Sequence, residues 1–171
     1  MGEVIITPIQ ESNAGDEVLE ALLTLNAAEV PHVGELDLKE LRELLSQSYY
    51  TGIARDENKI AGFIVAMLPG VDYQSLNYRW FAENYERFLY VDRIVVAPDY
   101  KGRGIGRRLY QAVADHNPVD ALILGCEVNL KPLNQDSLDF HARLGFSEVG
   151  QQDTEGGKKR VSLLALDLHP S

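Results

Sequence analysis

The sequence predicts a mixed α/β fold in a single domain that spans residues 1–171. Short apolar runs typical of strands alternate with segments whose apolar residues recur at three- and four-residue steps, which is typical of amphipathic helices. With 171 residues, 45% of them hydrophobic, the chain is long enough to bury a sizeable core. No apolar run approaches the roughly 20 residues that a membrane-spanning helix requires. We therefore expect a soluble, cytoplasmic protein with no membrane partner.

Composition narrows the classes of ligand. A single cysteine excludes an internal disulfide framework, and neither it nor the four histidines show metal-ligand spacing, so we expect no metal. The formal net charge of -10 disfavours nucleic acid, which proteins bind largely through phosphate contacts. The same charge mildly favours a cationic or amine substrate, although surface acid often serves only solubility.

The first half of the chain is expected to hold one strand, two helices and a hairpin. Pro8 closes the first strand, and Ser12 or Asn13 can cap the first helix. Asp37 and Glu40 have the spacing of a capping box, in which each side chain bonds the backbone N–H of the other. The expected elements, in order, are a strand at 3–7, a helix that ends before Pro31, a helix at 36–48, and a hairpin of 49–55 with 59–68.

The second half centres on a strand, a glycine-rich loop and a helix. The loop has glycines at positions 102, 104 and 106, which let the backbone approach a ligand closely. A helix that starts near Gly104 presents unpaired N–H groups and the positive end of its dipole, which favours an anion, most naturally phosphate. Four basic residues between Asp99 and Asp115 support an anionic ligand: Lys101, Arg103, Arg107 and Arg108. The expected elements are strands at 88–97, 119–128, 146–149 and 159–168, with helices from Gly104 to His116 and from Asn134 to Leu144.

The spacing of its glycines distinguishes this loop from two common phosphate-binding loops. A dinucleotide loop needs G-x-G-x-x-G, but Arg107 stands where the third glycine belongs. An NTP-binding loop needs G-x-x-x-x-G-K-[S/T], a pattern that this loop lacks. Instead, Val96–Gly106, VAPDYKGRGIG, resembles the acetyl-CoA signature V-x-P-x-Y-R-G-x-G-I-G of the GNAT superfamily of N-acetyltransferases. Asn134–Phe146, NQDSLDFHARLGF, is similar to the second motif of that family, N-x-x-A-x-x-F-Y-x-x-L-G-F.

The resemblance implies a twisted mixed, largely antiparallel sheet flanked by helices, with a splayed strand pair that holds acyl-CoA. Acetyl-CoA is then a co-substrate, with its diphosphate at the glycine loop and its pantetheine arm paired with the backbone of strand 88–97. The family usually has arginine or glutamine at position 101. Lysine keeps the charge but loses the forked donor geometry, so backbone N–H groups should carry most of the diphosphate binding. The residues that the resemblance assigns to the coenzyme are Ile94, Val96, Lys101, Gly102, Arg103, Gly104, Ile105, Gly106 and Asn134.

Three residues are the candidates for catalysis: Asp92, Glu127 and His141. An amine attacks a thioester only as the free base, so Asp92 is expected to take its proton, directly or through a water. The alternatives for Asp92 are a pair with Arg93 or a contact with a cationic substrate. Glu127 would orient the amine or act as the base, and its alternative is a salt bridge with Arg93 or Lys131. His141 stands where many relatives have a tyrosine thought to protonate the departing thiolate. An imidazole with a pKa of about 6.5 could donate that proton, only donate a hydrogen bond, or have no chemical role.

Residues 69–87 form a connection that is longer than usual and rich in aromatic side chains. One interpretation is a lid or wall over the acceptor, with Tyr78 and Trp80 as substrate-binding residues. The other is a loop that packs its own rings onto the sheet or forms a dimer contact. The resemblance adds Tyr90, in strand 88–97, as a substrate-binding residue that faces the acceptor.

These features predict an N-acetyltransferase that moves an acetyl group from acetyl-CoA to a primary amine of a small molecule, by direct attack in a ternary complex. Two other functions stay open at this point. One is acetylation of a protein lysine or N-terminus, which needs an open groove, and the other is binding of acyl-CoA without catalysis. Dimerisation is common in the family, which leaves a homodimer open.

Overall fold

The computed structural model describes residues 3–169, which belong to two compact units. Unit 1 comprises Met1–Met67 and Arg93–His116, and unit 2 comprises Leu68–Asp92 and Asn117–Ser171. The expectation of a single domain stays a prediction. In the part of the chain that the structure describes, no helix is both long enough and apolar enough to cross a membrane.

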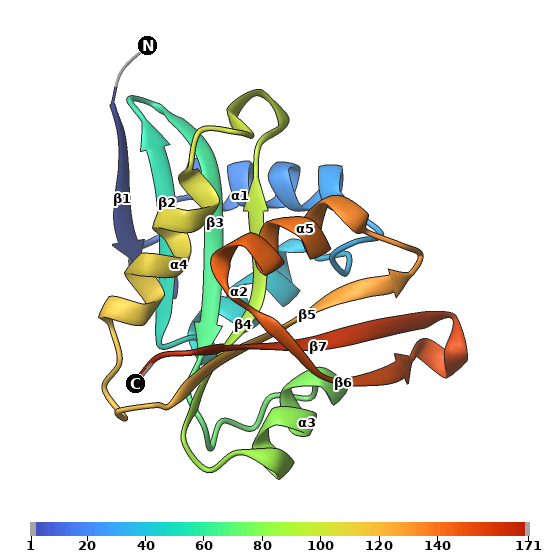
Figure 1. Ribbon diagram of the computed structural model, residues 1–171. Helices are drawn as coiled ribbons and strands as arrows, with labels where there is room; N and C mark the ends of the chain where they lie inside the picture. Colours follow the sequence, from blue (N-terminus) through green and yellow to red (C-terminus); the bar gives the residue numbers. More distant parts are fainter. Residues whose placement is uncertain (1–2, 170–171) are drawn as a thin grey trace. The chain divides into compact units, whose positions relative to one another are not determined.

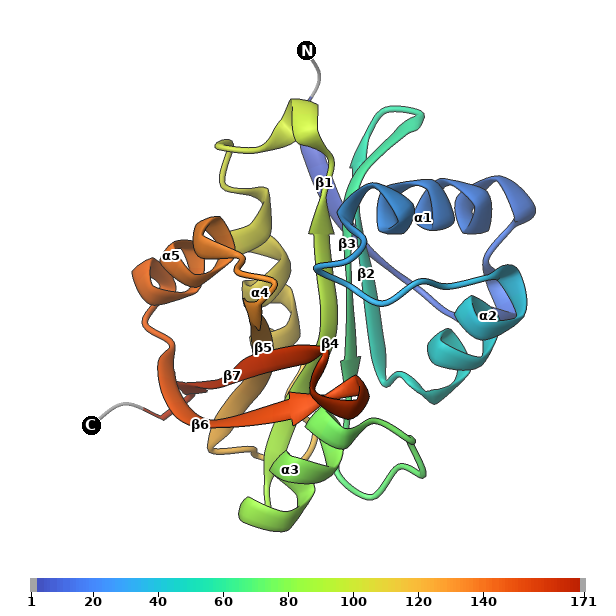
Figure 2. The ribbon, with the colours of Figure 1, turned by 90° about the vertical axis from the view of Figure 1, so that its right-hand side faces the viewer.

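Unit 1 is a layer of strands covered by helices on both faces. Its elements are β1 (Val4–Ile9), α1 (Asp16–Glu29), α2 (Leu38–Gln47), β2 (Tyr50–Asp56), β3 (Lys59–Met67), the second half of β4 (Phe88–Val96) and α4 (Ile105–Asp115). Helices α1 and α2 lie on one side of β1–β3, and α4 lies on the other (Figures 1 and 2). The apolar stripe of α4 is buried at Ile105, Leu109 and Val113, as its three- and four-residue spacing predicts.

Unit 2 contains the remaining strands and two helices. Its elements are α3 (Leu76–Asn84), the first half of β4, β5 (Ile123–Lys131), α5 (Gln135–Leu144), β6 (Ser147–Thr154) and β7 (Lys159–Asp167). Helices α3 and α5 both pack on β5, and they lie on opposite sides of the β5–β7 strands (Figure 2).

The strands follow the order β1-β2-β3-β4 in unit 1 and β4-β5-β7-β6 in unit 2. The pairs β1–β2, β2–β3, β5–β7 and β6–β7 are antiparallel, whereas β4 and β5 pair in parallel. This confirms the predicted fold class, a mixed α/β fold with a largely antiparallel sheet.

Most expected elements of unit 1 are present, with two corrections. The prediction that Pro8 closes the first strand is wrong, because β1 continues to Ile9 and Pro8 stands opposite Gly52. Proline is tolerated there because β1 is an edge strand, where an N–H group is not needed on the outer side. The first helix is capped by Gly15, and not by Ser12 or Asn13, which lie in a preceding 3-10 turn. The capping box of Asp37 and Glu40 is confirmed at the start of α2.

Unit 2 departs from the prediction mainly in the aromatic connection. Residues 69–87 contain the nine-residue helix α3, whose start is capped by Ser75 through a bond from the Tyr78 N–H. Two of its rings, Tyr78 and Phe81, are buried. Strand β5 begins at Ile123 and not at residue 119, because Asn117 closes a turn by hydrogen bonds to both the N–H and the carbonyl of Ala121. Strand β6 runs on to Thr154, beyond the predicted end at 149, because it stays paired with β7.

Candidate active site

The glycine loop of unit 1 is exposed from Lys101 to Gly104. Gly102 and Gly104 have φ of +81° and +77°, a left-handed conformation that favours glycine. A Cβ atom added at either position would meet no atom within 4 Å, so the loop is open on that side. Ile105 and Gly106, the first residues of α4, are buried. The groups that this segment offers to a ligand are therefore the N–H groups of the first helical turn, which have no partner within a helix.

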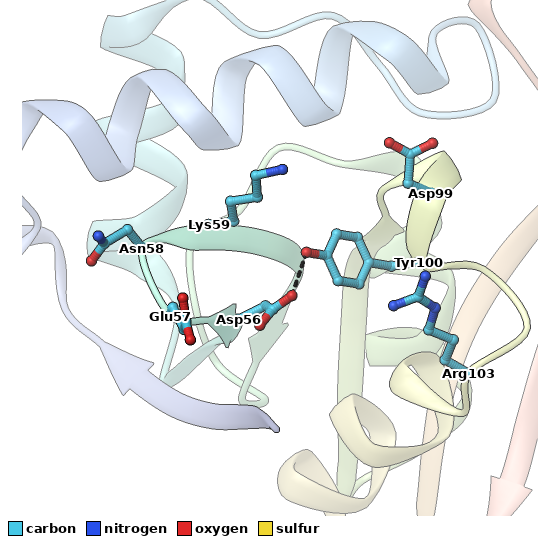
Figure 3. A pocket seen from close by; sticks show the side chains of 7 residues that line it. All are labelled: Asp56, Glu57, Asn58, Lys59, Asp99, Tyr100 and Arg103. Atoms are coloured by element: carbon cyan, nitrogen blue, oxygen red, sulfur yellow. Dashed lines mark hydrogen bonds between the residues drawn. The ribbon is translucent and has the colours of Figure 1, made fainter. Parts of the chain in front are cut away.

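The loop also carries cations that contact other parts of unit 1. The Lys101 ammonium lies 3.2 Å from the carboxylate of Glu29. The Arg103 guanidinium lies over the ring of Tyr100, 4.9 Å from its centroid, and the Tyr100 hydroxyl donates to Asp56 Oδ2 at 2.6 Å. An open hollow of about 810 Å³ adjoins this cluster (Figure 3). Its lining residues are Asp56, Glu57, Asn58, Lys59, Asp99, Tyr100 and Arg103.

Strand β4 pairs with β5 over only part of its length. Its parallel pairing with β5 covers three residue pairs, from Phe88 with Ile123 to Tyr90 with Gly125. Just after the other end of β4, the Ala97 N–H donates to the carbonyl of Ala61 in β3 at 2.7 Å. The predicted coenzyme contacts Ile94 and Val96 lie past the last β4–β5 pair, and both are half-buried.

Two carboxylates of unit 2 are bonded to tyrosine hydroxyls. Tyr90 is fully buried, and its hydroxyl lies 2.8 and 3.0 Å from the two carboxylate oxygens of Glu127. The Tyr73 hydroxyl donates to Asp92 Oδ1. Burial, followed by the charges of Glu127 and Asp92, raises the pKa of Tyr90 well above 10. Tyr90 is therefore a protonated donor at neutral pH, and both carboxylates lie near its hydroxyl.

Of the other two predicted acceptor residues, Tyr78 packs against this cluster and Trp80 does not. Tyr78 is buried, and its ring meets those of Tyr73 and Tyr90 edge-on at 5.7 and 5.4 Å. Its hydroxyl donates to the Leu68 carbonyl at 2.6 Å and accepts from the Val71 N–H at 3.1 Å. Tyr78 thereby holds the irregular segment that carries Tyr73. Half-buried Trp80 packs elsewhere: a Cβ atom added at Gly150 would lie 2.6 Å from its ring.

His141 is enclosed in the packing of α5. It is 2% exposed, and its ring meets Phe140 and Phe146 edge-on, each at 5.1 Å between centroids. Its Nδ1 lies 2.7 Å from the Ser137 carbonyl oxygen, so Nδ1 carries a proton. Burial lowers the pKa of His141 below 6.5, against a smaller opposite effect of that hydrogen bond. The imidazole is therefore neutral at pH 7. Asn134 caps the same helix, because its Oδ1 accepts from the Ser137 N–H at 3.3 Å.

The structure brings some predicted residues together and adds others. Asp92, Glu127 and Tyr90 belong to one cluster, to which Tyr73 adds a hydroxyl bonded to Asp92. The aromatic content of residues 69–87 was the available signal for Tyr73. No local sequence pattern indicates a role for Asp56, because its hydrogen bond to Tyr100 joins the end of a hairpin strand to a loop 44 residues away. Arg93, an alternative partner for both carboxylates, donates to Asn26 Oδ1 at 2.8 Å and to the Gly34 carbonyl at 3.0 Å.

Within residues 3–169, no group of three or more His, Cys, Asp or Glu side chains could hold a metal ion. The open glycine turn, the short β4–β5 pairing and the largely antiparallel sheet agree with the fold that the resemblance implied. Residues 17–146 match the model of the acetyltransferase (GNAT) family. The chain belongs to this family.

Solved structures agree in fold. The ribosomal-protein-S18-alanine N-acetyltransferase from Escherichia coli is 19% identical, with a TM-score of 0.68 over 99% of this chain and 96% of that chain. An aminoglycoside 6'-N-acetyltransferase complexed with coenzyme A is 17% identical, with a TM-score of 0.73 over 98% of each chain. The yncA structure from Salmonella typhimurium, with its cofactor acetyl-CoA, is 15% identical, with a TM-score of 0.68 over 99% of this chain and 96% of that chain. No curated protein matches the sequence significantly.

Proposed function

We propose that this protein is an acetyl-CoA-dependent N-acetyltransferase that acts on a primary amine of a small cationic molecule. The coenzyme proposal is supported by family membership and by similar structures that contain coenzyme A or acetyl-CoA. The observation that carries the acceptor proposal is the pair of carboxylates near one buried hydroxyl. Asp92 and Glu127 place two negative charges near Tyr90, which favours a ligand that carries positive charge.

The glycine loop and β4 would hold the coenzyme. The N–H groups at the start of α4, with Lys101 and Arg103, suit the diphosphate. The backbone of Ile94 and Val96 suits the pantetheine arm, and Asn134 would bond to the same arm. When bound, acetyl-CoA supplies a thioester carbonyl that an amine can attack. Backbone N–H groups of β4 would polarise that carbonyl.

Asp92 would be the general base. In the reaction an N–C bond forms, the C–S bond breaks, and Asp92 takes the proton that the amine loses. Its hydroxyl partner Tyr73 would have to release Asp92 Oδ1 when an acceptor arrives. Tyr90, by contrast, is fixed in β4 and holds both oxygens of Glu127. We therefore assign proton transfer to Asp92 and orientation of the amine to Glu127.

His141 would act neither as an acid nor as a donor to the thiolate, because the one N–H proton of its neutral imidazole is donated to the Ser137 carbonyl. Its lowered pKa leaves the imidazole neutral near pH 7, and its Nδ1 proton faces the Ser137 carbonyl. A thiolate with a solution pKa of about 8.5 is a fair leaving group without help.

Helix α3, which lies between β3 and β4 in the sequence, favours a small acceptor molecule. Helix α3 covers β5, because Phe81 packs on Gly125, and Tyr78 and Tyr90 fill the space between them with rings. A helix and aromatic rings packed over β5 in this way suit a compact pocket better than an open groove for a peptide. The aminoglycoside enzyme acts on a small amine, whereas the ribosomal-protein enzyme acts on a protein alanine, so the second class stays the alternative. A cytoplasmic location is part of the same proposal.

Release of free coenzyme A from acetyl-CoA, measured with a panel of free amines and of peptides, tests this function. We expect turnover with di- or polycationic small amines and much less with lysine-bearing or N-terminal peptides. Faster turnover of peptides would favour the protein acetyltransferase. Tight coenzyme A binding without any turnover would favour a non-catalytic acyl-CoA-binding protein.

A further inference from the structure

Two cations of the glycine loop are held in different ways. Lys101 faces the carboxylate of Glu29, whose negative charge offsets that of the ammonium. Arg103 lies on the ring of Tyr100, which is neutral. A ring face attracts and orients a guanidinium without cancelling its charge. The contact with Tyr100 therefore gives the Arg103 guanidinium a preferred direction.

Tyr100 is itself anchored at its far end. Its hydroxyl donates to Asp56 Oδ2 at 2.6 Å, and Asp56 is the last residue of β2, next to the hairpin turn. This hydrogen bond is the main cause that raises the pKa of Tyr100 above 10, so the hydroxyl stays a donor near neutral pH. Figure 3 shows the sequence of contacts along the wall of the hollow, from the Asp56 carboxylate through the Tyr100 ring to the Arg103 guanidinium.

The loop needs such an anchor because of its glycines. Arg103 stands between Gly102 and Gly104, both with positive φ, and glycine loses more backbone freedom on ordering than any other residue. A long side chain on such a loop also loses rotamer freedom when it binds a ligand. A ring fixed to a strand end restricts both kinds of freedom before the ligand arrives.

We propose that Tyr100, anchored by Asp56, is a positioning residue that holds Arg103 ready for the diphosphate of acetyl-CoA. The proposal rests on the proposed function, because it takes the coenzyme as the ligand of this loop. Arg103 then supplies a side-chain cation at the diphosphate.

The test is the dissociation constant of coenzyme A, measured by calorimetry on the full chain. Tyr100→Leu should raise the dissociation constant about two- to fivefold, which corresponds to the loss of an exposed cation–π contact. Arg103→Gln should raise it roughly tenfold, because a charge-assisted hydrogen bond is lost. The double variant should bind about as well as Arg103→Gln alone, since Tyr100 acts through Arg103. Lys59→Gln, which removes a cation from the same hollow, is the matched control and should bind like the wild type.

Two further measurements separate positioning from a general loss of loop structure. Tyr100→Phe keeps the ring and removes only the hydrogen bond to Asp56. Its dissociation constant for coenzyme A should therefore lie between those of the wild type and Tyr100→Leu. Pantetheine, which lacks the diphosphate, should bind the wild type and Tyr100→Leu equally. The proposal is overturned if both Tyr100 variants bind coenzyme A like the wild type, if the two single losses multiply in the double variant, or if pantetheine binding falls in parallel. A wild-type protein that does not bind coenzyme A would instead contradict the proposed function.

Discussion

At the scale of single residues, Asp92 and Glu127 have different surroundings and should respond differently to neutralisation. Asp92→Asn keeps the size of the side chain and removes the base, so kcat should fall by about 10²- to 10⁴-fold. Glu127→Gln should mainly raise the KM of the amine, because the pair with Tyr90 orients the acceptor and does not take its proton. Initial rates of coenzyme A release at varied amine concentration measure both effects. The exposed Glu83→Gln on α3 is the control. Equal losses of kcat in the two variants would contradict the division of roles.

His141 gives a prediction about stability and pH. Burial lowers its folded pKa below 6.5, so between these two pKa values the unfolded chain binds a proton that the folded chain does not. Its contribution to the free energy of unfolding is therefore fully present above about pH 6.5 and is lost as the pH falls through the folded pKa. His141→Gln cannot titrate, so its melting temperature should fall less than that of the wild type between about pH 7.5 and pH 5.5. His116→Gln, which replaces an exposed histidine, is the matched control. Parallel melting curves for wild type and His141→Gln at both pH values would show that this histidine does not carry the pH dependence.

At the scale of elements, helix α3 depends on one close approach to β5. A Cβ atom added at Gly125 would lie 2.5 to 2.7 Å from three atoms of the Phe81 ring, and Phe81 is fully buried. Gly125→Ala should therefore cost about 1–3 kcal/mol of unfolding free energy by overpacking. Gly34→Ala, where an added Cβ meets nothing within 4 Å, is the matched control.

Denaturant unfolding of four proteins tests this packing. The wild type, Gly125→Ala, Phe81→Leu and the double variant form a cycle. The smaller leucine leaves room for the added methyl group. The double variant should therefore lose less unfolding free energy than the sum of the losses in the two single variants. Additive losses would mean that the ring and the glycine do not meet.

At the scale of the whole molecule, the sequence predicted what is local and missed what is distant. The order of elements, the capping box at Asp37 and the glycine loop all follow from neighbouring residues, and all are present. Helix α3 was missed because its aromatic residues have weak helix propensity, so packing against β5 and the Ser75 cap decide its conformation. The hydroxyl partners were hidden for a similar reason. Tyr73 reaches Asp92 across 19 residues and Tyr90 reaches Glu127 across 37, distances over which a local pattern carries no information.

Binding of acetyl-CoA should stabilise the whole molecule, and one glycine should control that effect. At a concentration about 100 times Kd, a ligand that binds only the folded state adds about 2.7 kcal/mol of unfolding free energy. For a chain of this length that corresponds to a rise in melting temperature of roughly 5–10 °C. Gly104→Glu should abolish the rise in melting temperature, because it puts a negative side chain at the start of α4. It also puts a non-glycine residue where the backbone has a φ of +77°, which is strained for any residue with a Cβ atom. Gly156→Glu is the matched control, since Gly156 also has positive φ and open space around its Cα but lies in the turn before β7. Both variants should lose stability without ligand, and only Gly156→Glu should recover it with acetyl-CoA. An unchanged melting temperature of the wild type at saturating acetyl-CoA would count against the coenzyme, and an equal rise in Gly104→Glu would count against the glycine loop as its site.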